Sequence, residues 1–299
     1  MDEMLSSDHR ETAASGVLQT AALGKDAVPF ICSRLSDRSL DERRDRHLII
    51  NSIRAMGIIR DASCTRTVIQ FICREADPLD RQLNDEIFRA LIRIGEPASV
   101  KALLETEDGE LSDSPFETFE DRFMRNLDAV QGDETIPKVQ SSLLSLLSSE
   151  RDKRLRLQIL NMISTLNDPQ SLDALLSLLL DSEPEIRREV IKMIFQRRAS
   201  EYKDHLHKAL EDTDEEVRTL AIYGLLLSDR SLDMDDMKNF IGMMAGMKGQ
   251  SQVKKEVESL LASFLIRSHQ EAKPMLLELI AKGDKETKLL ANKLMSRLD

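Results

Sequence analysis

The sequence predicts an all-α protein, a right-handed α-solenoid of stacked antiparallel helix pairs, and three observations lead to that prediction. A helical-hairpin unit occurs twice in succession within residues 170–229, and a step of 31 residues carries Asp181 onto Asp212 and Arg187 onto Arg218. Apolar positions recur at helical spacing along most of the chain. Charged residues make up 32% and aromatic residues 4%, with few Gly and Pro, a composition that favours helix.

Three apolar residues spaced four apart mark the second helix of each unit. The triplets are Leu83-Ile87-Leu91, Phe119-Phe123-Leu127, Leu155-Ile159-Ile163, Ile186-Val190-Ile194, Val217-Ala221-Leu225 and Val253-Val257-Leu261. The steps between them are 36, 36, 31, 31 and 36 residues. Because stacked repeats bury their apolar faces only against their neighbours, we expect residues 1–299 to form a single solenoid.

The N-terminal part is expected to begin with a frayed segment at residues 1–10. Helices are predicted over residues 11–23, over residues 26–35 with Pro29 in the first turn, and over residues 45–59. Three later boundaries carry Gly, Asn or Pro, residue types that end helices. They are Gly95-Glu-Pro97, Gly132-Asp133 and Asn167-Asp-Pro169.

Two segments depart from the period. Eight acidic residues and no basic one lie between Glu105 and Asp121, which predicts an acidic loop at residues 105–118, either a helix N-terminal segment or a docking site for a basic partner. A methionine-rich segment with three glycines predicts a Gly-containing loop at residues 245–252. Its methionines either fill the core or contact a partner helix.

An acidic residue precedes a basic residue by six positions in several units. The pairs are Glu150 and Arg156, Asp181 and Arg187, and Asp212 and Arg218. The position of the arginine holds Lys254 in a later unit and Asn84 and Glu120 in earlier units. This pattern resembles the HEAT repeat, in particular the short bacterial kind of phycobilisome-lyase-like proteins. The resemblance implies a curved stack of helix pairs that binds other proteins. We expect the recurrent Arg156, Arg187 and Arg218 to bridge adjacent turns rather than to hold a ligand.

Composition narrows the classes of partner. A net charge of −11 argues against general affinity for nucleic acid or anionic lipid, which both bind cationic surfaces. No apolar run approaches the roughly 18 residues of a membrane span, and no secretion signal is visible, so we expect a cytoplasmic protein without membrane insertion. Three cysteines at unrelated spacings give neither a disulfide framework nor a metal quartet.

Signatures of catalysis are missing from the sequence. None of the five histidines belongs to a His-Glu pair, and His205 and His207 point about 200° apart on a helix. Gly-rich phosphate loops and a nucleophile elbow are absent, and the lack of Trp opposes a base-flipping enzyme. We therefore expect a non-enzymatic scaffold or adaptor without a cofactor. The alternative is a HEAT-type lyase or modifying protein that holds a small ligand in its concave face.

The residues two and six positions after the start of each triplet are expected to face away from the core, along the concave side of the stack. Those chosen as candidate contacts with another protein are Arg89, Arg125, Asn161, Arg188, Lys192 and Tyr223. Among them Arg188, Lys192 and Tyr223 are predicted to be exposed and to meet an acidic partner segment, because Arg and Tyr often anchor interfaces. Self-association is a further possibility.

Overall fold

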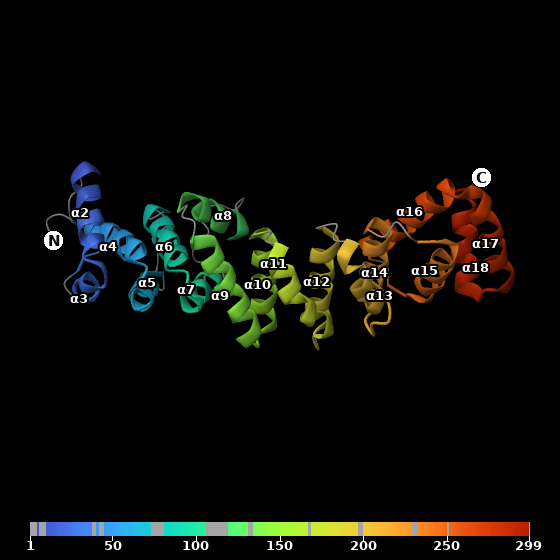
Figure 1. Ribbon diagram of the computed structural model, residues 1–299, viewed down its shortest axis with the longest axis horizontal. Coiled ribbons are helices and arrows are strands. Elements are labelled where there is room, and N and C mark those ends of the chain that lie inside the picture. Colours follow the sequence, from blue (N-terminus) through green and yellow to red (C-terminus); the bar gives the residue numbers. More distant parts are fainter. Residues whose placement is uncertain are drawn as a thin grey trace. The chain divides into compact units, whose positions relative to one another are not determined.

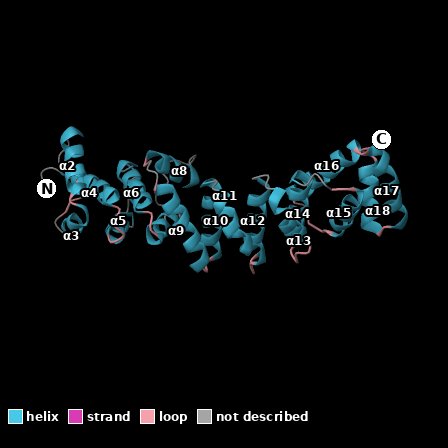
Figure 2. Cartoon of the chain, in the orientation of Figure 1, coloured by secondary structure: helices cyan, strands magenta, loops and turns pink. Residues whose placement is uncertain are grey.

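The structure is a computed structural model. It describes residues 5, 10–37, 40–41, 45–72, 81–105, 119–130, 134–166, 169–196, 200–228, 232–249 and 251–298. Within those ranges every regular element is a helix and no strand occurs (Figure 2), so the prediction of an all-α helical repeat fold is confirmed. The chain divides into two compact units, residues 1–167 and 168–299, which are described in turn. A single right-handed solenoid over residues 1–299 stays a prediction.

Two layers of helices make up the first unit (Figure 1). One layer holds α2 (Arg10–Ala22), α4 (Arg46–Ile59), α6 (Arg81–Ile94) and α8 (Phe119–Ala129), each in contact with the next. The other holds α3 (Val28–Leu35), α5 (Cys64–Ile72), α7 (Pro97–Glu105) and α9 (Thr135–Ser149), again in consecutive contact. A 3-10 turn, η1 (Gly24–Ala27), precedes α3, and α10 (Lys153–Leu166) packs on α7 and α9.

Local sequence explains the boundaries of these helices. Pro29 lies in the first turn of α3, where its missing N–H costs nothing. After α6 the chain reverses at Gly95, whose φ of 63° is in the left-handed region, and the Gly95 N–H donates to the Leu91 carbonyl at 2.9 Å. The next helix then begins at Pro97. The predicted boundary at Gly132-Asp133 lies outside the described residues.

A close approach of α4 to α6 sets the spacing of the first layer. A Cβ placed on Gly57 would lie 2.8 Å from the Ala90 Cα, so only glycine permits this contact. On the core side of α4, Ile49, Ile53 and Met56 are fully buried. The core side of this layer is therefore tightly packed.

The second unit continues the helix pairs. Its elements are α11 (Pro169–Leu175), η4 (Leu176–Leu180), α12 (Pro184–Gln196), η5 (Ser200–Tyr202), α13 (Lys203–Ala209), α14 (Glu215–Ser228), α15 (Met234–Gly246), α16 (Gln252–Arg267), α17 (His269–Lys282) and α18 (Lys285–Met295). Helices α12, α14 and α16 contact one another in succession, and α15 packs on α17 and α18. The apolar triplets of α12 and α14 are completely buried, so these residues face the core as predicted.

The segments that depart from the period are described only in part. Residues 106–118 of the predicted acidic loop, and all but Leu5 and Arg10 of the predicted frayed segment 1–10, lie outside the described residues. The Gly-containing loop is shorter than the predicted 245–252, because α15 continues through Gly246. Buried Met237, Met244 and Met247 show that this segment fills the core. Within the described ranges, no helix combines the length and apolarity needed to cross a bilayer.

Candidate functional site: an arginine-lined pocket and a ladder of turn contacts

A cavity of about 800 Å³ lies in the first unit, where α2, α4, α6 and α8 face solvent. Its apolar lining comes from Ala13, Ala14, Val17, Leu18, Ile50, Ile58 and Ala129, and its polar lining from His47, Asn51, Arg54, Gln82, Glu86, Arg89 and Arg93. The two kinds of residue are equal in number. The lining holds three arginines beside aliphatic side chains, although the protein has a net charge of −11.

One buried carboxylate organises the polar side of this pocket. Glu86 is 4% exposed, and its Oε1 accepts a hydrogen bond from Arg54 Nη2 at 2.8 Å and another from Arg89 Nη1 at 3.0 Å. The Asn51 Oδ1 accepts from Arg54 Nη1 at 3.3 Å, and Asn51 Nδ2 donates to the Leu5 carbonyl at 2.7 Å. These bonds fix the orientation of two guanidinium groups in the pocket wall.

Arg93 lies in the same wall without a fixed partner. Within the described part of the chain it makes no hydrogen bond and no ion pair. Burial lowers the pKa of Arg93, the Glu86 carboxylate opposes that shift, and the nearby guanidinium groups of Arg89, Arg60 and Arg54 lower the pKa further. The pocket lining therefore holds three guanidinium groups and one carboxylate, and it carries excess positive charge.

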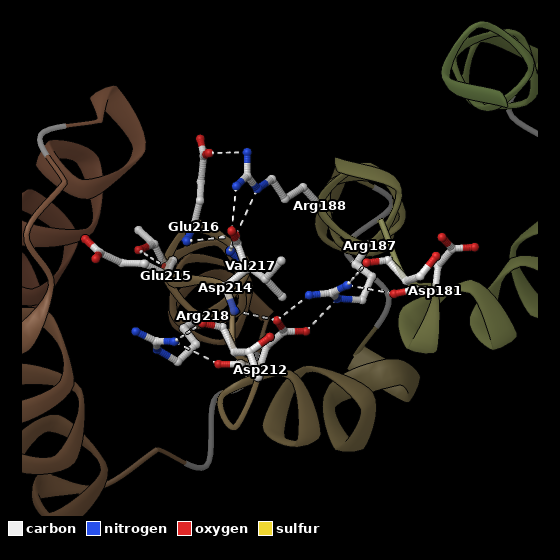
Figure 3. Close-up of polar contacts among 12 residues, drawn as sticks. Asp181, Arg187, Arg188, Asp212, Asp214, Glu215, Glu216, Val217 and Arg218 are labelled. Carbon is white, nitrogen blue, oxygen red and sulfur yellow. Dashed lines mark hydrogen bonds and ion pairs between the residues drawn. The ribbon is translucent and has the colours of Figure 1, made fainter. Parts of the chain in front are cut away.

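In the second unit, Arg187 joins consecutive turns of the repeat (Figure 3). Its Nε and Nη2 donate to the two carboxylate oxygens of Asp212 at 2.8 and 2.7 Å, and its Nη1 donates to the carbonyls of Asp181 and Ser182 at 2.6 and 3.3 Å. The hydrogen bond to Asp212 raises the pKa of Arg187. Burial alone would raise the pKa of Asp212, but hydrogen bonds from Arg187 and from the Asp214 N–H bring it below its usual value.

The next two units repeat only part of this contact. Arg218 Nη1 donates to the carbonyls of Asp212 and Thr213 at 2.8 and 3.1 Å but forms no ion pair with any described residue. Lys254 Nζ donates to the Met247 carbonyl. In each case the basic side chain satisfies carbonyl groups of the turn before its own helix. Arg156, the first residue of the series, lies half-buried on α10.

The three predicted partner contacts nearest the N-terminus, Arg89, Arg125 and Asn161, lie in different surroundings. Arg89 lies in the pocket, bonded to Glu86. Arg125 on α8 donates from Nη2 to Asp85 Oδ1 of α6 at 3.1 Å, a contact between neighbouring helices. Asn161 is exposed on α10. Of these three residues, Arg89 lines the pocket and Arg125 and Asn161 do not.

The expectation that Arg188, Lys192 and Tyr223 are exposed needs correction, because all three residues are half-buried. Arg188 forms a bidentate pair with Asp214, with N–O distances of 3.0 and 2.7 Å, and a second ion pair with Glu216 at 2.6 Å (Figure 3). The physical reason is that α12 packs beside α14, whose N-terminal turn is acidic. These three residues remain candidates, but Arg188 already has its charge balanced within the chain.

The other two residues of this group are also engaged. Lys192 Nζ bonds to Glu189 at 3.0 Å, one turn earlier on its own helix. The Tyr223 ring packs edge-on against Phe195 at 5.1 Å between ring centroids. Burial of the half-buried Tyr223 side chain, with the negative charge of Glu256 beside it, raises the pKa of its hydroxyl. Tyr223 therefore contributes to helix packing.

Sequence reasoning missed Arg54, Glu86 and Arg93. A signal for Arg93 was present, because it follows Arg89 by four residues and so continues the same face of α6. No comparable signal existed for Arg54, which comes from a helix before the first traced triplet. The pocket depends on the contact between α4 and α6, which sequence spacing does not show.

Comparisons with known proteins give the following matches. Residues 141–226 match the family model of HEAT repeats. The solved complex of CpcE and CpcF of phycocyanin lyase from Nostoc sp. PCC7120 is similar at 15% identity and a TM-score of 0.31, covering 88% of this chain and 92% of that chain. YibA of Escherichia coli is similar at 17% identity and a TM-score of 0.41, covering 98% and 97%. No curated protein matches the sequence.

Proposed function

We propose that this chain, of which residues 141–226 match the HEAT-repeat family model, is a non-catalytic scaffold or adaptor that binds another protein. The observation that supports the proposal is the pocket of the first unit. Four consecutive helices of one layer contribute to it, so a partner lying there would contact several repeats at once. Repeat proteins bind partners in this way, since stacking leaves one long surface uncovered.

The lining of the pocket favours a protein partner over a small ligand. Small-molecule sites are lined predominantly by apolar and aromatic groups with a few placed polar groups. Here seven of the fourteen described lining residues are polar, five of those seven are charged or titratable, and none of the fourteen is Phe, Tyr or Trp. A charged lining with exposed aliphatic side chains is closer to the composition of a protein interface.

Leu18 offers the most direct test. This side chain lines the pocket and is 62% exposed, so Leu18→Asp should remove an apolar contact without disturbing the core. Leu289→Asp is the matched control, because Leu289 is 73% exposed on α18 in the other unit. Tagged parent and variant proteins would be purified from the cells that produce them, and co-purifying proteins identified by mass spectrometry.

We expect a protein partner that the parent and Leu289→Asp retain and Leu18→Asp loses. A partner retained equally by all three proteins would place the binding surface outside the pocket. Purification with a tightly held small molecule and without a protein would instead favour the ligand-holding alternative. Sedimentation of each purified protein identifies self-association separately.

A further inference from the structure

The excess positive charge of the pocket identifies the chemistry of its occupant. Arg54 and Arg89 donate hydrogen bonds to the same oxygen of Glu86, so a single carboxylate is paired with two guanidinium groups. Arg93 adds a third guanidinium group that no described carboxylate contacts. An anionic group entering the pocket would gain charge-assisted hydrogen bonds that the free protein does not make.

The size of the pocket and its apolar residues further restrict the kind of ligand that fits. A cavity of about 800 Å³ is much larger than a single carboxylate or phosphate group. Leu18 and Ile58, which are 62% and 39% exposed, supply aliphatic surface beside the guanidinium groups. A ligand that matches both features carries acidic and aliphatic side chains on one face. Nucleic acid has no aliphatic face, and a protein of net charge −11 repels it at long range.

We propose that the pocket formed by α2, α4, α6 and α8 binds an acidic amphipathic segment of a partner protein. Carboxylates of that segment pair with Arg89 and Arg93, and its aliphatic side chains contact Leu18 and Ile58. This inference rests on the proposed protein-binding function and specifies the chemical class of the partner. Arg54 is already bonded to both Glu86 and Asn51, so the segment is expected to pair with Arg89 and Arg93 instead.

Arg93 is the residue on which the test depends. Because it lies among like charges and lacks a described ionic partner, replacing it with a neutral residue should not weaken the fold. Arg93→Gln should therefore leave the melting temperature unchanged or raise it, while weakening the binding of an acidic segment. If Arg93 had a purely structural role, its replacement would instead lower the melting temperature and leave the binding of an acidic segment unchanged. Arg66→Gln, on the exposed face of α5, is the matched control with the same change of charge.

The experiment uses the full chain and fluorescence anisotropy. The probe is a labelled helical peptide with Glu and Leu at amphipathic spacing, compared with a Gln/Leu peptide and a Lys/Leu peptide of equal length. We expect the Glu/Leu peptide to bind most tightly and its affinity to fall about tenfold in Arg93→Gln, the loss of roughly one charge-assisted hydrogen bond. Arg66→Gln should bind like the parent, and salt should weaken binding.

Three results would overturn the proposal. They are equal binding of the Glu/Leu and Gln/Leu peptides, equal binding by Arg93→Gln and the parent, and displacement of the peptide by an oligonucleotide or inorganic phosphate at lower concentration than by unlabelled peptide. If the acidic peptide fails while Leu18→Asp still loses its cellular partner, the protein-binding function stands and the acidic occupant is refuted.

Discussion

Replacing Arg187 with Ala tests whether the ladder of turn contacts stabilises the second unit. The change removes two hydrogen bonds to the Asp212 carboxylate and two to backbone carbonyls. It also leaves the Asp212 side chain, which is 12% exposed, with the Asp214 N–H as its remaining hydrogen-bond donor among the described residues. Removing one partner of a buried ion pair costs about 3–5 kcal/mol, and because this pair is partly exposed we expect about 2–4 kcal/mol.

Arg218→Ala is the matched control for this experiment. Arg218 makes the same two carbonyl contacts and forms no ion pair with a described residue, so its loss should cost about 1–1.5 kcal/mol. The difference between the variants measures the contribution of the carboxylate. Urea denaturation followed by circular dichroism gives both free energies of unfolding. If Arg187→Ala is no more destabilising than Arg218→Ala, the ion pair between turns contributes nothing and the reasoning is wrong.

Two further predictions concern the same unit. Val190 is completely buried on α12, so Val190→Asp should lower the free energy of unfolding by about 3–5 kcal/mol, and a melting temperature equal to that of the parent would contradict this. The pKa of Asp212 is lowered in the folded state, so its stabilisation is complete above an unfolded pKa of about 3.9 and is lost as the pH falls through the folded value. As the pH is lowered, the free energy of unfolding should therefore fall more in the parent than in Arg187→Ala. The same dependence of this free energy on pH in both proteins would refute the prediction.

The fold was predictable because its determinants are local and repeated. The triplet of α12 and the reversal at Gly95 follow directly from apolar spacing and backbone preference. The contact of Arg187 with Asp212 was partly visible, because a step of 31 residues aligns one unit with the next. Its bidentate geometry depends on how α12 lies against α14, which the period does not specify.

The candidate site was harder to predict because it depends on which helix faces meet. Arg188 has the same sequence character as Arg89, both being basic residues on the face away from the triplet. In the structure Arg188 meets Asp214 and Glu216, whereas Arg89 shares Glu86 with Arg54. Arg188 receives both carboxylates from the start of the neighbouring helix, whereas Arg89 contacts a carboxylate of its own helix that Arg54 of α4 also contacts. A single sequence does not reveal that balance.

The contact between Arg187 and Asp212 also bears on how such a chain can lengthen. Residues 182–212 begin just after one acidic turn and end on the next, and the arginine within them bonds forward to that second turn. A tandem duplication of those 31 residues would give every new arginine the same backbone carbonyls behind it and the same carboxylate ahead. At this contact, copying would leave no arginine without its carboxylate. Gene duplication would therefore preserve the contact between turns without a second, compensating mutation.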